Sequence, residues 1–177
     1  MTEAALAPLQ RAQQLAGGAA TAAVVGAILI ALGAVADGAS PALDALARQQ
    51  VTFDLRGLLD LVRVVGLFTV VALPSFLLAG ALLDLSQVLD EYGKGQFFTL
   101  KASAGVRKAA EGALWALAFK IVASPTIYSW ITQEGRGFIW HFEPFDLGLL
   151  AFAAFVAVLG RVLEAAARIK EENDEIV

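Results

Sequence analysis

The chain has 177 residues, of which 58% are hydrophobic, a formal net charge of −4 and a mean hydropathy of +0.69. This apolar content exceeds the roughly 45–50% of soluble domains and would leave large apolar patches in water, so the composition predicts a single compact membrane domain. The modest charge argues against direct binding of nucleic acid. The absence of cysteine excludes a disulfide framework, thiol catalysis and cysteine-ligated metals.

The first apolar segment, residues 17–36, contains no charged residue and is long enough to cross a bilayer as a helix. The tripeptide at 34–36 resembles a signal-peptidase site, but the apolar run is longer than a usual signal core, so we expect a retained span. Ala23, Ala27 and Ala31 recur at helical spacing within it. These alanines either allow close approach of another helix or reflect a general richness in alanine, and both interpretations stay open.

A more polar stretch, residues 37–63, leads to the second span, residues 64–83. Ser40-Pro41 predicts the end of the first helix, and charges of alternating sign before the second span predict a solvated helical face. Pro74 lies in the middle of the second span. Because proline lacks a backbone donor, we expect a kink there, with the freed carbonyl satisfied by a hydroxyl or a neighbouring helix.

The connection at residues 84–111 contains the most basic part of the chain, and its glycines predict a break after the second span. Thr99 is a favourable N-cap for a helix that continues through Lys108. Basic residues just outside a span favour the anionic cytoplasmic leaflet. The connection therefore predicts a cytoplasmic face between the second and third spans.

The third span, residues 112–131, holds Lys120 near its centre and Pro125 in its second half. An ammonium group inside a bilayer is costly, so Lys120 should face protein or water. Ser124 lies one turn further on the same helix face, as in a Ser–Lys nucleophile–base pair. We favour a different interpretation, in which Lys120 is satisfied by carbonyls freed around Pro125 or by a carboxylate of another helix, or reaches the interface.

Aromatic side chains crowd the end of the third span and the loop after it, which predicts a belt at the membrane surface: Tyr128, Trp130, Phe138, Trp140, Phe142 and Phe145. His141 and Glu143 offer two potential metal ligands, fewer than a usual site requires, so we predict neither a metal nor a cofactor. No phosphate-binding glycine loop or nucleophile elbow is present. The fourth span covers residues 145–166.

A charged tail, residues 167–177, follows the fourth span. Either its carboxylates close the cytoplasmic face by pairing with cations of the connection at 84–111, or the tail is solvated, and both interpretations stay open. The groups concerned are Glu171, Glu172, Asp174 and Glu175 in the tail and Lys101, Arg107 and Lys108 in the connection. Lys and Arg are more numerous on the side of the termini and this connection than on the other side, which predicts cytoplasmic termini.

Two stretches resemble motifs of the DUF2975 family of bacterial membrane proteins, and the resemblance is best from about residue 82 to the end. Residues 95–99 (GQFFT), followed by a basic helix, are similar to the family's G-x-F-S-x-E-N motif, with one more residue between the glycine and the hydroxyl residue, here Thr99. Counted from Thr99, Lys101 and Ala102 stand where the family has Glu-Asn. Residues 167–174 and the final apolar pair are similar to its closing motif. The resemblance implies a four-helix inner-membrane protein of unknown function, often encoded beside a small helix-turn-helix regulator.

The sequence thus predicts an all-α, polytopic integral membrane protein, a four-transmembrane-helix bundle of the bacterial inner membrane. We expect a non-enzymatic protein, embedded in the lipid bilayer, that binds a partner at its cytoplasmic face. The family's gene neighbourhood suggests a small helix-turn-helix regulator as that partner. The alternatives are a structural or accessory subunit of a larger membrane complex and, less favoured, a transporter or channel that uses Lys120. The oligomeric state stays open.

Overall fold

The computed structural model describes residues 3–47, 55–96, 99–132 and 137–174, and within these ranges it contains helices and no strand. The elements are α1 (Glu3–Ala47), α2 (Leu55–Gly93), α3 (Leu100–Ala118), a π-helical turn η1 (Phe119–Ala123), α4 (Ser124–Thr132) and α5 (Pro144–Asp174). Because α3, η1 and α4 follow one another without a gap, they form one long helix. Four helices are long and apolar enough to cross a membrane: Gln10–Asp44, Gly57–Gly93, Leu100–Thr132 and Pro144–Asn173. The predicted class, an all-α polytopic membrane protein, is confirmed.

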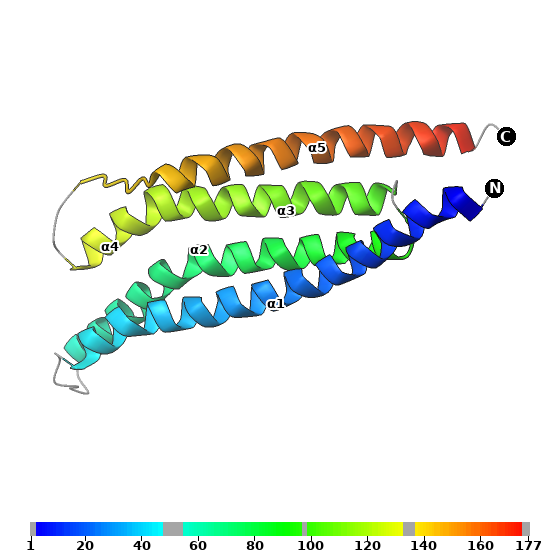
Figure 1. Ribbon diagram of the computed structural model, residues 1–177. Coiled ribbons are helices and arrows are strands. Elements are labelled where there is room, and N and C mark those ends of the chain that lie inside the picture. The colour runs from blue at the N-terminus through cyan, green and yellow to red at the C-terminus, as the bar shows by residue number, and fades with distance from the viewer. Residues whose placement is uncertain (1–2, 48–54, 97–98, 133–136, 175–177) are drawn as a thin grey trace.

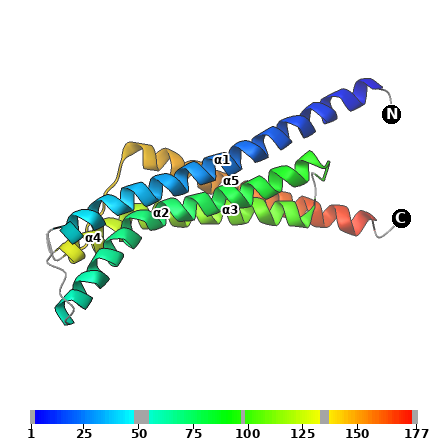
Figure 2. The same ribbon diagram turned by 90° about the horizontal axis from the view of Figure 1, so that it is seen from below.

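The four helices lie side by side in chain order (Figure 1): α1 packs on α2, α2 on α3, and α3 on α5. Both ends of the described chain and the start of α3 lie at one end of the molecule, whereas α4 lies at the other (Figure 1). We call the end that holds the two ends of the described chain and the start of α3 the terminal end. Figure 2 shows that the first turns of α1 point away from the other helices.

The helices extend beyond the predicted spans. The helix end predicted at Ser40-Pro41 is wrong, because α1 continues to Ala47. Packing against α2 explains this continuation: a Cβ atom on Gly38 would lie 3.1 Å from the carbonyl oxygen of Phe68, so the two backbones are in close contact around the proline. Tertiary contact therefore outweighs the local tendency of proline to end a helix.

The connection predicted at 84–111 is mostly helical, since α2 runs to Gly93 and α3 begins at Leu100. The predicted break is confirmed at Gly95, whose φ of 83° lies in the left-handed region that glycine adopts without strain. The predicted N-cap is also confirmed. Thr99 has φ −114° and ψ 147°, and its Oγ1 accepts a hydrogen bond of 3.1 Å from the backbone N–H of Ala102.

Small residues line the contact between α5 and α3. The buried positions of α5 recur every seven residues: Asp146, Ala153, Gly160 and Ala167. A Cβ atom on Gly160 would lie only 2.9 Å from the backbone nitrogen of Arg107, so glycine permits the close approach. In α1, Ala27 is buried (2% exposed) and Ala23 and Ala31 are half-buried. This favours the close-approach interpretation of the alanines in the first span.

Candidate functional site

Pro74 and Pro125 each free a carbonyl oxygen, and in each case a distant segment supplies the missing donor. The hydroxyl of Ser124 donates to the Val70 carbonyl oxygen at 3.1 Å. In a regular helix this carbonyl would accept from the backbone N–H of residue 74, which proline lacks. The backbone N–H of His141 donates at 3.0 Å to the Ile121 carbonyl, which Pro125 leaves free in the same way. The expectation that a hydroxyl or a neighbouring helix would satisfy the carbonyl freed by Pro74 is confirmed. The early part of α2 also turns away from its later part (Figure 2).

Lys120 lies in the π-helical turn and binds the first turn of α5. Its Nζ is 2.7 Å from Oδ1 of Asp146 and 3.5 Å from Oε2 of Glu143. The Asp146 side chain is fully buried, whereas 44% of the Lys120 side chain is exposed. Asp146 also accepts a hydrogen bond of 3.2 Å from the backbone N–H of Glu143, which caps the start of α5. The expected carboxylate of another helix is therefore Asp146.

Lys120 and Ser124 do not form a nucleophile–base pair in the structure. Ser124 donates to the backbone of α2, and Lys120 binds a carboxylate of α5. Each polar group serves a different helix contact, so the arrangement lacks the hydrogen bond by which a base activates a nucleophile.

An extended segment, Gly137 to Glu143, returns along α4 and brings the start of α5 to Lys120. Thr126 anchors it: Oγ1 donates to the Ile139 carbonyl at 2.7 Å and accepts from the Ile139 N–H at 3.1 Å. Of the six aromatic residues predicted to form a belt, Tyr128 is half-buried and five are exposed: Trp130, Phe138, Trp140, Phe142 and Phe145. His141 and Glu143 are 3.7 Å apart, and no cluster of three or more potential metal ligands occurs among the residues described.

At the terminal end, α3 is bound to α2 by two ion pairs. Lys101 Nζ lies 2.6 Å from Oε1 of Glu91, and Lys108 Nζ lies 2.8 Å from Oδ1 of Asp84. Asp84 and Glu91 are separated by seven residues, as are Lys101 and Lys108. This equal spacing on two antiparallel helices is a signal in the sequence that is consistent with the pairing but does not determine it.

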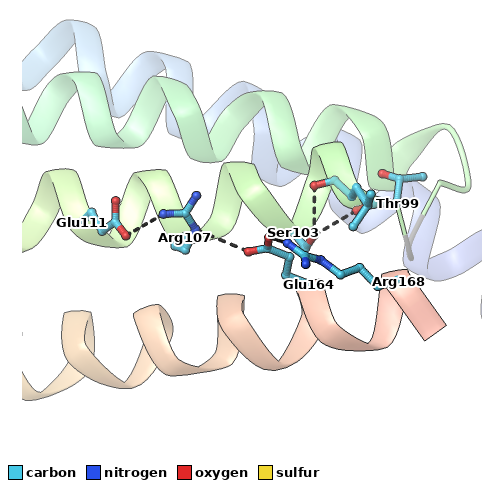
Figure 3. Close-up of polar contacts among 7 residues, drawn as sticks. Thr99, Ser103, Arg107, Glu111, Glu164 and Arg168 are labelled. Carbon is cyan, nitrogen blue, oxygen red and sulfur yellow. Dashed lines mark hydrogen bonds and ion pairs between the residues drawn. The ribbon is translucent and has the colours of Figure 1, made fainter. Parts of the chain in front are cut away.

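On the opposite side, α3 is bound to α5 through a charged cluster that we call the Arg107 cluster (Figure 3): Arg107, Glu111, Glu164 and Arg168. Arg107 Nη1 is 2.9 Å from Glu111, and its Nε is 3.5 Å from Glu164. Arg168 approaches the other oxygen of Glu164 at 2.8 Å. Glu164 thus lies between two guanidinium groups, one from each helix. Its contact with α3 is a long ion pair, since the buried Nε of Arg107 makes no hydrogen bond to the described residues.

One interpretation proposed that the tail carboxylates pair with the cations of the connection, and the two described ones, Glu171 and Glu172, do not. Glu171 and Glu172 are exposed and form no ion pair with any other described residue. The cations of the connection pair with Asp84, Glu91, Glu111 and Glu164 instead, since these carboxylates face α3 from adjacent helices or from its own next turn. The side chain of Asp174 and all of Glu175 lie outside the described residues.

Comparison with known families gives one match, which covers nearly the whole chain. A family model described as "Protein of unknown function (DUF2975)" matches residues 3–177. No curated protein and no solved structure matches. The match includes the first two spans, where the sequence motifs alone gave no specific resemblance.

Proposed function

The chain belongs to the DUF2975 family, whose description assigns no activity, and we propose that it is a bacterial inner-membrane protein that binds a partner protein at its terminal end. We place this end in the cytoplasm. The support is the number of cations in the N-terminal part of α1, the connection at 84–111 and the charged part of α5: Arg11, Lys94, Lys101, Arg107, Lys108, Arg161, Arg168 and Lys170.

The observation that carries this proposal is the charged helical extension of α5. The charges of α5 begin at Arg161, within the predicted span, and the helix continues from there to Asp174, roughly 20 Å at 1.5 Å per residue. Its packing also continues, since Ala167 is only 1% exposed and Glu164 is bound by Arg107. A helix that only crossed the bilayer would not need this ordered length outside its apolar run.

The outward side of this extension suits a charged partner. Lys170, Glu171 and Glu172 are exposed, and the two carboxylates form no ion pair with the described residues. Such groups confer specificity and fast association more than affinity. The gene neighbourhood of the family makes a small helix-turn-helix regulator the first partner to test. The proposed role is non-enzymatic, because each charged group of the Arg107 cluster is paired with another member of the cluster.

The test uses four forms of the chain at matched expression and compares the proteins that each form captures from membranes. These are the full chain, a form lacking Glu171 to Val177, Glu172→Lys, and the control Asp90→Lys. Asp90 is also exposed at the terminal end but lies on α2. We expect a cytoplasmic partner that the full chain and Asp90→Lys retain and the other two lose. Identical partner sets from all four forms would refute the proposal.

A structural or accessory subunit of a larger complex is the second candidate, and the open row of helices favours it. In the described structure, α1 packs mainly on α2, and α5 mainly on α3. Each edge helix therefore keeps an apolar outer face, which on α5 includes Phe152 and Phe155. If this candidate is correct, Phe152→Ala/Phe155→Ala releases the partners and removal of Glu171 to Val177 does not. A transporter or channel is less favoured, since Asp146 holds Lys120.

A further inference from the structure

Helix α3 presents one narrow exposed stripe to its surroundings. Four of its residues are exposed, and three of them recur every seven residues: Lys101, Lys108 and Trp115, with Ala118 as the fourth. A spacing of seven residues places side chains on one face of a helix. Because α2 and α5 cover much of the rest of α3, these three side chains form a single line, which we call the Lys101–Trp115 stripe.

The cations of this stripe point outward, while their countercharges are recessed. The Lys101 side chain is 78% exposed and its partner Glu91 only 14%. The Lys108 side chain is 72% exposed and its partner Asp84 only 22%. A molecule that approaches the stripe therefore meets two ammonium groups first, although each ion pair is balanced in charge.

The stripe changes from cationic to apolar along the helix axis. Trp115 is 71% exposed and lies in the uncharged segment between Glu111 and Lys120. It is seven residues from Lys108, roughly 10 Å along the axis. Tryptophan collects at the boundary between headgroups and acyl chains, and lysines beyond that boundary reach the headgroup phosphates. An occupant of this stripe must be anionic at one end and apolar at the other.

We propose that the Lys101–Trp115 stripe binds an anionic phospholipid, with Lys108 and Lys101 at the headgroup phosphate and Trp115 against the first part of an acyl chain. An acidic segment of a protein complements the lysines but not a tryptophan in the apolar part of the helix, so the order of residues favours a lipid. The proposal is independent of the partner protein at the α5 extension. It depends on the proposed orientation only for the choice of leaflet.

The test uses the fluorescence of Trp115 in the full-length protein. The chain has three tryptophans, so Trp130→Phe/Trp140→Phe leaves Trp115 as the only one. The protein is reconstituted into phosphatidylcholine vesicles that contain a minor fraction of brominated phosphatidylglycerol or, in parallel, the same fraction of brominated phosphatidylcholine. Bromine quenches tryptophan on contact. We expect the anionic lipid to be enriched about fivefold at Trp115, the size expected for a lysine at an anionic surface.

Substitutions identify the groups responsible. Lys101→Gln/Lys108→Gln should abolish the preference for phosphatidylglycerol, whereas the charge-conserving Lys101→Arg/Lys108→Arg should keep it. Lys170→Gln is the matched control, because it removes an exposed lysine of the terminal end that lies on α5. Raising the ionic strength should weaken the preference by screening the lysines.

Equal quenching by the two brominated lipids would overturn the proposal, as would an equal loss in Lys170→Gln. If the preference is absent while Lys101→Gln/Lys108→Gln loses a protein partner, the stripe binds an acidic protein and the lipid assignment is wrong. The form lacking Glu171 to Val177 should keep the lipid preference. The lipid proposal and the partner proposal can therefore be confirmed or refuted independently.

Discussion

The hydroxyl of Ser124 occupies the place of the backbone donor that Pro74 removes, and it donates to the Val70 carbonyl across the contact between α4 and α2. The proline thus creates a polar contact between helices in a region where a free carbonyl is costly. Pro125 does the same for the segment that follows α4, whose His141 N–H binds the freed Ile121 carbonyl.

This relationship predicts a specific result from a double-mutant cycle. Ser124→Ala should lower the free energy of unfolding by about 0.5–1.5 kcal/mol, because the Val70 carbonyl loses its donor. In a Pro74→Ala background the alanine N–H should satisfy this carbonyl, so the same substitution should cost less than half as much. Unfolding in mixed detergent micelles measures both values. An equal cost in the two backgrounds would show that the hydroxyl does not serve the carbonyl freed by the proline.

The close contact at Gly160 predicts a strong effect of one methyl group. Gly160→Ala should destabilise the protein by about 1–3 kcal/mol, since the new Cβ would meet the Arg107 backbone at 2.9 Å and force α5 away from α3. Gly148→Ala is the control on the same helix, where a Cβ would meet nothing within 4 Å. That variant should be neutral or slightly stabilising, because alanine favours helix. Similar melting temperatures for the two variants would contradict the packing.

Removal of Lys120 alone should be harmful, because it leaves the buried Asp146 without its cation. The cost of Lys120→Leu should be somewhat below the roughly 3–5 kcal/mol of a fully buried pair, since 44% of the Lys120 side chain is exposed. Lys120→Leu/Asp146→Asn should recover most of the loss, because asparagine still accepts the Glu143 N–H and carries no charge. Thermal unfolding in detergent compares the forms. A double variant as unstable as the single one would argue against the pair.

The orientation can be tested by thiol labelling, because the chain lacks cysteine. Single cysteines at the exposed positions Ala47, Lys94, Gly137 and Asn173 sample both ends of the molecule. In intact cells, an impermeant reagent should label Ala47 and Gly137, and it should label Lys94 and Asn173 only after permeabilisation. Labelling of Asn173 in intact cells would reverse the proposed orientation.

The sequence predicts those features that depend on local chemistry. Apolar length identifies the four membrane-spanning helices, and a hydroxyl before a helix identifies the cap at Thr99. The costs of a buried ammonium group and of a free carbonyl predict polar partners for Lys120 and Pro74, and the structure supplies them. These expectations succeed because each follows from a group that cannot remain unsatisfied in lipid.

The identity of several partners could not be predicted, because it depends on register and on the path of a loop. Asp146 reaches Lys120 only because Thr126 holds Ile139 and turns the chain back along α4. By charge alone, the tail carboxylates are also suitable partners for the basic connection. The antiparallel register of α2 and α3 instead aligns Glu91 with Lys101 and Asp84 with Lys108. The equal spacing of the two pairs suggests this alignment but does not determine it.

The packing of the helices in chain order has a consequence for synthesis. Each long helix after α1 packs against the helix made directly before it, so most contacts between helices join neighbours in the sequence. The chain can therefore assemble stepwise while it leaves the ribosome and enters the bilayer, because no early helix must wait for a main neighbour that is made much later. Helix α5 completes the row last, when Asp146 meets Lys120 at one end and Glu164 meets Arg107 at the other.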